Sequence, residues 1–168
     1  GAGRAVYDDW LNLCVWAKSN AGMGSLYRSQ HELIAVFKKG KRPHINNVEL
    51  GSNGRHRSNV WNHAGANSFS NARSEELGWH PTVKPAEMIS DILKDASDRD
   101  DIVLDGFGGS GTTLIAAEHS GRTARLLELD PLYCDVILRR FLNAIQATMR
   151  TNFFQPGHGR KFKPYLSF

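Results

Sequence analysis

An acid and a run of glycines form the most chemically informative stretch of the sequence, IVLDGFGGSGTTLIAA, which begins at Ile102. Asp105 ends a short apolar run, and four glycines follow it within six residues. Three of these glycines fit the pattern G-x-G-x-x-G, and Glu128 lies about 20 residues further on, where an acid can bind ribose hydroxyls. Bare backbone lets a nucleotide approach closely, so the stretch indicates a nucleotide-type ligand. The three matching glycines are Gly106, Gly108 and Gly111.

The position of Asp105 bears on which nucleotide binds. A pyrophosphate at this loop would lie against the carboxylate, and like charges repel. A ligand with a cationic group would instead be attracted, and S-adenosylmethionine carries an amino group, a sulfonium and a ribose without any phosphate. A nicotinamide or flavin nucleotide is the alternative ligand, and a loop that only turns the chain is the structural alternative. A P-loop is disfavoured because no lysine precedes Thr112.

A second motif, HPTVKP at residues 80–85, places a hydroxyl and a lysine just before a predicted helix. Pro85 suits the first turn of a helix, and apolar residues then recur at helical spacing as far as Ala96. Thr82 and Lys84 would therefore lie near a helix N-terminus, which favours a carboxylate ligand. Taken alone, the same hexapeptide is equally consistent with a structural turn.

The elements that must position these residues form one βαβ crossover. Residues 102–104 predict a buried parallel strand, and residues 124–129 predict a second strand. Between them, Thr112 or Thr113 can cap a helix that ends at Gly121. Ligands of such sheets bind at the carboxyl ends of the strands, and the glycine loop lies at that end.

Three motifs together resemble those of DNA amino-methyltransferases: HPTVKP, then DGFGGSGTT, then LLELDPLYCDVILRRF. Upstream, strands are expected at residues 11–16 and 33–37, joined by a long loop. That segment is similar to the stretch after the catalytic motif in the permuted group, in which the cofactor half is C-terminal. The resemblance covers roughly residues 7–141. One departure is Gly106, which stands where the family motif Asp-Pro-Phe-x-Gly-Ser-Gly-Thr has proline.

The resemblance implies direct methyl transfer from S-adenosylmethionine to N6 of adenine or N4 of cytosine in double-stranded DNA. It also implies an α/β, Rossmann-like methyltransferase fold with a mostly parallel sheet. In such a pocket Asp105 would bind the methionine amino group, Glu128 the ribose hydroxyls, and Thr82 and Lys84 the carboxylate. The expected cofactor-binding residues are Thr82, Lys84, Asp105, Gly106, Phe107, Gly108, Gly109, Ser110, Gly111, Thr112, Glu128 and Asp130.

The family's catalytic tetrapeptide contains a Pro-Pro pair, and this sequence has none. The tetrapeptide holds the flipped base in the family, and in the permuted order it would lie upstream of Gly1. We therefore assign no catalytic residue within the chain and expect a C-terminal portion that is inactive alone. Two central strands of the sheet would be missing with it, so we expect the fold to be incomplete. Either an upstream segment or a second copy would then complete the sheet.

Residues 38–79 form a basic insertion, rich in Asn, Gly, His and Ser, in the place where the family has its target-recognition segment. Residues 38–73 hold six net positive charges, more than the +4 of the whole chain. Such a segment can neutralise DNA phosphates and reach base edges, although a solvated surface loop would look similar. The predicted DNA-binding residues are Lys38, Lys39, Lys41, Arg42, Arg55, Arg57 and Arg73.

The composition fits one domain, residues 1–168, of which residues 80–145 are the predicted cofactor-binding part. The sequence shows no membrane span and no signal-peptide pattern, so we expect a cytoplasmic protein, bacterial or phage-encoded. Cys14 and Cys134 are expected to be free thiols, and without a C-x-x-C motif no metal site is predicted. Besides the restriction–modification type of methylase, a nicotinamide- or flavin-binding protein and a non-catalytic methylase remnant remain open.

Overall fold

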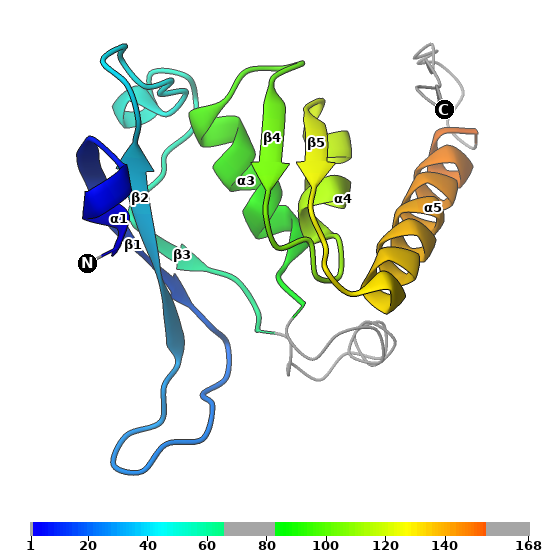
Figure 1. Cartoon of the computed structure of the whole chain (residues 1–168), viewed down its shortest axis with the longest axis horizontal. Coiled ribbons are helices and arrows are strands. Elements are labelled where there is room, and N and C mark those ends of the chain that lie inside the picture. Colours follow the sequence, from blue (N-terminus) through cyan, green and yellow to red (C-terminus); the bar gives the residue numbers. More distant parts are fainter. Residues whose placement is uncertain (1, 66–82, 154–168) are drawn as a thin grey trace.

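The computed structural model describes residues 2–65 and 83–153, and its side chains as far as residue 149 (Figure 1). An N-terminal sheet lies on one side of the molecule, and a βαβ unit followed by a long helix lies on the other. A helix between them, α3 (Ala86–Ala96), packs against both parts. The chain is thus a mixed α/β structure with two separate sheets in its described part.

The N-terminal sheet has the strand order β2-β1-β3. After a short helix, α1 (Ala2–Val6), strand β1 (Asp9–Ala17) pairs antiparallel with β2 (His31–Lys38) and parallel with β3 (Val60–Asn62). The two longer strands confirm those predicted at residues 11–16 and 33–37. Between β2 and β3 the chain is mostly irregular, apart from the 3₁₀ turn η1 (Glu49–Gly51).

The core of this half lies between the sheet and α3. It is formed by Cys14, Trp16, Trp61 and Met88, and Trp16 is only 2% exposed. The predicted apolar face of α3 supplies Met88, together with Ile89 at its border. Burial raises the pKa of the Cys14 thiol, and both cysteines are free, as predicted.

The second half confirms the predicted crossover. Strand β4 (Ile102–Asp105) pairs in parallel with β5 (Thr123–Leu126), and helix α4 (Thr112–Ser120) connects them. Gly121 ends α4 in the left-handed conformation, with φ of 74°, as the sequence predicts. The chain then enters helix α5 (Pro131–Phe153).

Two local predictions are wrong. Helix α4 is not capped by a threonine, because its N-cap is Gly111 and no side chain caps it. The hydroxyl of Thr113 donates instead to Asp105. The strand predicted at residues 124–129 ends at Leu126, since the main chain of Leu127 then bonds to Asp105 and to the glycine loop.

Strand β4 has β5 as its one partner among the described residues, so its other edge is unpaired there. Ile102 and Leu104 on this strand are 69% and 71% exposed. An unpaired strand with exposed apolar side chains is typical of a sheet that lacks a neighbour. The structure is therefore consistent with an incomplete Rossmann-like fold. None of the helices in residues 2–65 and 83–153 combines the length and apolar character needed to cross a membrane.

Candidate functional site

The glycine loop, residues 106–111, leaves the tip of β4 and turns directly into α4. Its turn is closed by the Gly111 amide, which donates to the Gly108 carbonyl at 2.8 Å. Gly111 has a φ of 78°, and a Cβ placed there would lie 2.9 Å from Ile137 of α5. A Cβ at Gly108 would also press on Ile137, at 3.2 Å. Glycine is needed at Gly111 because of its left-handed φ and its close approach to Ile137, whereas a side chain at Gly108 would require Ile137 to shift slightly.

Asp105 lies at the mouth of this loop with its carboxylate held in a fixed orientation. One oxygen accepts a hydrogen bond from the Phe107 amide at 3.0 Å, and the other accepts one from the Thr113 hydroxyl at 2.6 Å. Beyond Asp105 the loop is open, since Gly106 is exposed and Phe107 is 92% exposed. The geometry presents an oriented hydrogen-bond acceptor beside bare backbone, which suits a cationic donor such as an amino group.

Glu128 reaches the same loop from the end of β5. Its Oε2 accepts the Gly109 amide at 2.7 Å, and its Oε1 accepts the Asp130 amide at 3.0 Å. A carboxylate fixed in this way presents oxygen acceptors, which are the groups that bind ribose hydroxyls. Asp130 itself accepts the Leu132 amide at 2.9 Å and so supports the first turn of α5. The structure thus brings Asp105, the loop and Glu128 together, as predicted.

Of the two residues predicted to bind the methionine carboxylate, Thr82 and Lys84, the structure describes Lys84. The Lys84 carbonyl accepts a hydrogen bond from Thr112 at 3.4 Å, so its backbone does lie beside the glycine loop. The Lys84 ammonium, however, is bound to Glu32 at 3.0 Å and lies over the Trp16 ring. Lys18 binds the other Glu32 oxygen at 2.7 Å. Thr82, the second predicted ligand of the carboxylate, lies outside the described residues.

This cluster changes the titration of Glu32. Partial burial raises the pKa of the Glu32 carboxyl, but the hydrogen bonds and charges of Lys18 and Lys84 outweigh that effect. The pKa of Glu32 therefore lies below its ordinary value. The cluster joins the end of β1 and the start of β2 to the segment before α3, so it links the N-terminal sheet to the second half of the chain.

Sequence reasoning missed one residue of the site, Arg140. This arginine of α5 is 8% exposed, and its Nη1 donates to the Ser110 carbonyl at 2.5 Å and to the Thr112 hydroxyl at 3.4 Å. The signal available in the sequence was its spacing, because Arg140 follows Ile137 by one helical turn and shares its buried face.

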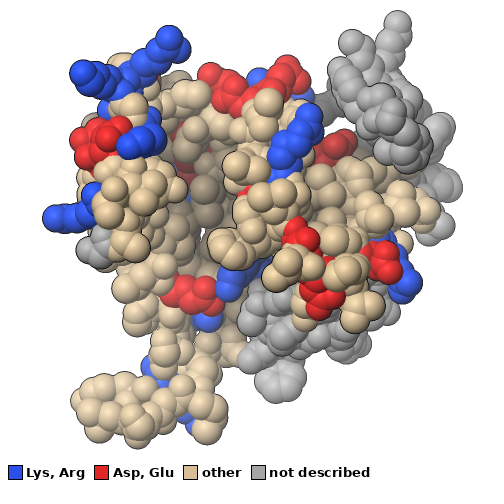
Figure 2. Space-filling model, in the orientation of Figure 1, with Lys and Arg blue, Asp and Glu red and all other residues tan. Residues whose placement is uncertain are grey.

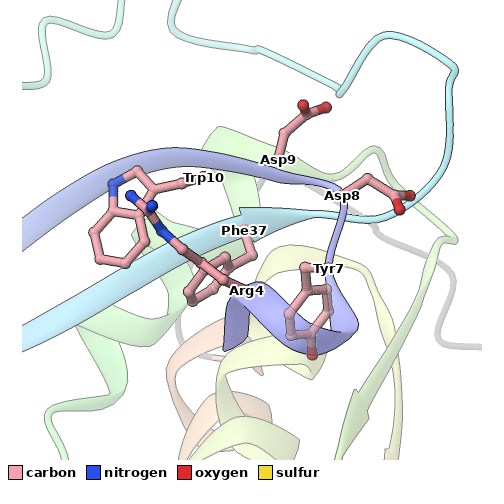
Figure 3. A pocket seen from close by; sticks show the side chains of 6 residues that line it. All are labelled: Arg4, Tyr7, Asp8, Asp9, Trp10 and Phe37. Carbon is pink, nitrogen blue, oxygen red and sulfur yellow. The ribbon is translucent and has the colours of Figure 1, made fainter. Parts of the chain in front are cut away.

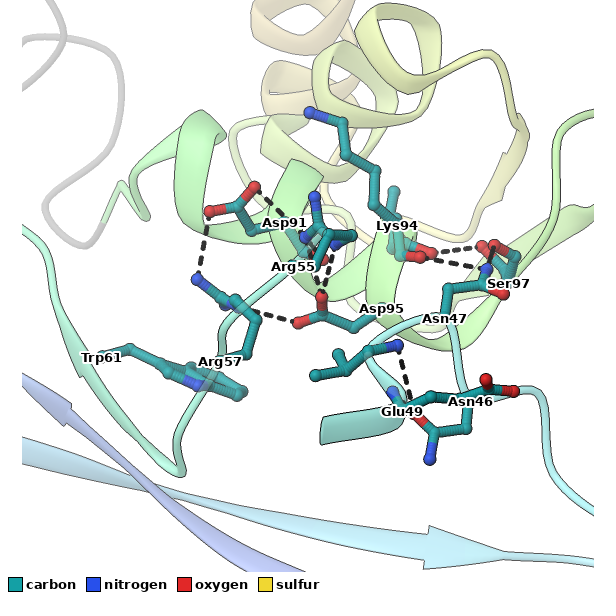
Figure 4. Close-up of polar contacts among 12 residues, drawn as sticks. Asn46, Asn47, Glu49, Arg55, Arg57, Trp61, Asp91, Lys94, Asp95 and Ser97 are labelled. Atoms are coloured by element: carbon teal, nitrogen blue, oxygen red, sulfur yellow. Dashed lines mark hydrogen bonds and ion pairs between the residues drawn. The ribbon is translucent and has the colours of Figure 1, made fainter. Parts of the chain in front are cut away.

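The basic segment is not a uniformly free cationic surface. Arg55 and Arg57 turn inward onto α3, where they bind Asp91 and Asp95 (Figure 4). Arg55 contacts Asp95 through two nitrogens, at 3.0 and 2.7 Å, and these side chains are 17–31% exposed. Burial lowers the pKa of Arg55, but Asp95 and Asp91 outweigh it and raise the pKa above its ordinary value. Arg57 also lies over the Trp61 ring, at 5.5 Å.

The remaining predicted DNA-binding residues fall into three groups. Lys38 and Lys39 pair with Asp9 and Asp8, at 3.1 and 3.3 Å. Lys41 and Arg42 are exposed. Arg73 lies outside the described residues. On the face shown in Figure 2 the basic side chains are dispersed, and several lie beside acidic ones.

A small hollow lies elsewhere, between α1 and the strands β1 and β2 (Figure 3). The ring of Phe37 stacks on Tyr7 at 5.2 Å and meets the edge of Trp10 at 5.0 Å. Among the described residues, none of those predicted to bind the cofactor lines this hollow. The described lining is aromatic and acidic and includes the cation of Arg4, and we assign it no ligand.

A glycine loop at the carboxyl end of a parallel strand, with an acid at or just after each of two neighbouring strand ends, is typical of Rossmann-like folds. Comparison with known proteins gives the family. The family model described as DNA methylase matches residues 9–139, and the chain therefore belongs to the DNA methylase family of amino-methyltransferases. A second model, for the catalytic domain of bacterial NAD-glutamate dehydrogenase, matches residues 121–168, a range that excludes Asp105 and the glycine loop.

Individual relatives agree with this family. The type II methyltransferase M2.MboI of Moraxella bovis is 30% identical over 152 residues, which cover 86% of this chain and 54% of the relative. The chain spans about half the length, or less, of the curated relatives it matches.

Solved structures give the same fold. TTHA0409 from Thermus thermophilus, solved in complex with S-adenosyl-L-methionine, is 26% identical with a TM-score of 0.60, over 86% of this chain and 57% of that chain. The cytosine-N4-specific PvuII DNA methyltransferase is 20% identical with a TM-score of 0.62, over 83% of this chain and 55% of that chain, and supports the fold.

Proposed function

We propose that the protein takes part in methyl transfer from S-adenosylmethionine to the exocyclic amino group of adenine (N6) or cytosine (N4) in double-stranded DNA. Family membership supports this proposal. The observation that carries it is the oriented carboxylate of Asp105 at the mouth of an open glycine loop. That group would attract a cationic ligand and repel the pyrophosphate of a nicotinamide or flavin nucleotide.

The cofactor supplies an electrophilic methyl group on its sulfonium. Our proposal assigns the methionine amino group to Asp105 and the ribose hydroxyls to Glu128, with the loop backbone between them. These residues fit such a ligand, since amide or hydroxyl donors hold both carboxylates at the glycine loop, where they present acceptors to an amino group and to hydroxyls. The remaining members of the proposed set are Gly106, Phe107, Gly108, Gly109, Ser110, Gly111, Thr112 and Asp130.

Thr82 and Lys84 complete the proposed set as ligands of the methionine carboxylate. The Lys84 ammonium is already bound to Glu32. Because an ammonium has three donors, it can bind the methionine carboxylate and still keep its contact with Glu32.

For DNA contact we propose Lys41 and Arg42, together with Arg73 from outside the described residues. Lys41 and Arg42 are exposed on the segment between β2 and β3. Arg55 and Arg57 are poorer candidates for phosphate contact, because binding a phosphate would require them to leave two carboxylates. Lys38 and Lys39 are intermediate, since each has one partly exposed acidic partner.

None of these residues is assigned to bind the target amino group of the base, since the chain contains no Pro-Pro pair. We propose that the residues that bind this amino group lie outside the 168 residues. The unpaired edge of β4 is the place where a strand from an upstream segment, or from a second copy, would join the sheet.

Calorimetric titration with S-adenosylmethionine tests the cofactor assignment. Asp105→Asn keeps an acceptor for Thr113 but removes the charge, and it should weaken binding by about 1.5–3 kcal/mol, as for a charge-assisted hydrogen bond. Asp135→Asn, an exposed acid on α5, is the matched control and should bind like the parent. Equal affinity of the parent and Asp105→Asn, or binding of NAD in place of S-adenosylmethionine, would contradict the proposal.

A further inference from the structure

One face of α5 lies directly beneath the glycine loop. Ile137 occupies the space against Gly108 and Gly111, where no Cβ could fit without displacing it. One turn later, Arg140 brings a buried guanidinium to the same loop. An apolar side chain and a hydrogen-bond donor on one face of α5 therefore both contact the loop.

The contacts of Arg140 fall on both sides of Gly111. Its Nη1 donates to the Ser110 carbonyl at 2.5 Å, while the amide of the same peptide group, that of Gly111, donates to Gly108 at 2.8 Å. The peptide plane between Ser110 and Gly111 is thus held from both of its polar ends. Rotation of that peptide would break two hydrogen bonds at once, one of them to a cation.

The same Nη1 extends the contact toward α3. It lies 3.4 Å from the Thr112 hydroxyl, which in turn donates to the Lys84 carbonyl at 3.4 Å. Arg140 is therefore connected through Thr112 to the segment that begins α3. These long hydrogen bonds are individually weak, but they join the three segments that the proposed cofactor site uses.

We propose that Arg140 is a positioning residue of the cofactor site. It does not touch the ligand, and it sets the orientation of the Ser110–Gly111 peptide and the distance between the glycine loop and the start of α3. This inference rests on the proposed function for the identity of the ligand, which is S-adenosylmethionine.

The test compares Arg140→Met with Arg139→Met. Arg139 is exposed on the next position of the same helix, so both variants lose one positive charge and gain the same side chain. Two quantities are measured: the affinity for S-adenosylmethionine by calorimetry, and amide hydrogen exchange of residues 108–113 and of β1 and β2. Arg140→Met should lower the affinity at least tenfold and speed exchange at Gly111, with β1 and β2 unchanged. Arg139→Met should match the parent in both measurements.

Arg140→Lys serves as the conservative variant, since an ammonium can still reach one acceptor. Its affinity should lie between those of the parent and Arg140→Met, and it also provides the test if the methionine variant does not fold. If the parent binds no S-adenosylmethionine, the proposed function fails, and exchange at Gly111 still decides the inference. Unchanged exchange at Gly111, or an equal loss of protection in β1 and β2, would overturn the positioning role.

Discussion

Removal of the Asp95 charge tests the inward-facing arginine cluster directly. Asp95 accepts three hydrogen bonds, two from Arg55 and one from Arg57, at 2.7–3.0 Å (Figure 4). Asp95→Asn keeps the size of the side chain but leaves both guanidinium groups with Asp91 as their remaining acidic partner. The cluster then carries an uncompensated positive charge against the core side of α3.

The magnitude of this loss follows from the burial of three side chains, those of Asp95, Arg55 and Arg57. Exposed pairs contribute about 0.2–1 kcal/mol, whereas breaking a fully buried pair costs about 3–5 kcal/mol. The Asp95 side chain is 17% exposed and its partners are 18–25% exposed, so the pairs lie between these limits but closer to the buried one. We expect the free energy of unfolding to fall by about 2–3 kcal/mol.

Urea denaturation followed by circular dichroism measures this loss. Asp100→Asn is the matched control, because Asp100 is exposed and adopts a left-handed conformation that asparagine tolerates well. The control should change stability by less than about 0.5 kcal/mol. An Asp95→Asn loss no larger than that of the control would refute the view that Arg55 and Arg57 serve the fold.

The glycine loop, the exposed basic residues between β2 and β3, and the Glu32 cluster each allow a further test. Gly111→Ala should destabilise the protein by about 2–4 kcal/mol through left-handed strain and overpacking, whereas Gly54→Ala, with similar φ but open space, should cost about 1–2 kcal/mol by thermal melting; equal losses would contradict the packing argument. Replacing Lys41 and Arg42 together with Ala should reduce the slope of log affinity for DNA against log salt by about 1.8, and an unchanged slope would exclude phosphate contact. Glu32→Gln should lose less stability than the parent as the pH falls below 4.5. The lowered pKa of Glu32 means that its ionised form stabilises the parent at pH values above the pKa of the unfolded state, and this stabilisation is lost when Glu32 is protonated. Parallel profiles of stability against pH for the two proteins would contradict this prediction.

Local features of this fold could be predicted because their causes are local. The apolar spacing of α3 and the left-handed stop at Gly121 depend on residues within one or two turns of each other. The approach of Asp105 and Glu128 to one loop also followed from the sequence, since parallel strands in a crossover place their carboxyl ends together. The short motifs of the sequence also predicted the family, and the family model that matches residues 9–139 covers them almost completely.

The cap of α4 shows why local rules fail at a site. Thr112 and Thr113 are good capping residues in isolation, but Asp105 accepts the Thr113 hydroxyl and Arg140 lies beside the Thr112 hydroxyl. Both competing partners come from other elements, and one is 28 residues away. No pattern within the helix itself could have indicated which hydrogen bond would form.

The sequence by itself determined the amount of charge between β2 and α3, and only the tertiary structure decided which of those charges are already neutralised. Arg55 and Arg57 are 34–40 residues from Asp91 and Asp95, and folding brings them within 2.7–3.5 Å. Lys41 and Arg42 belong to the same basic segment, and the sequence alone does not distinguish them from Arg55 and Arg57, but they are exposed. The physical reason is that ion pairing depends on distance and desolvation, and neither is fixed for groups far apart in the chain until the chain has folded.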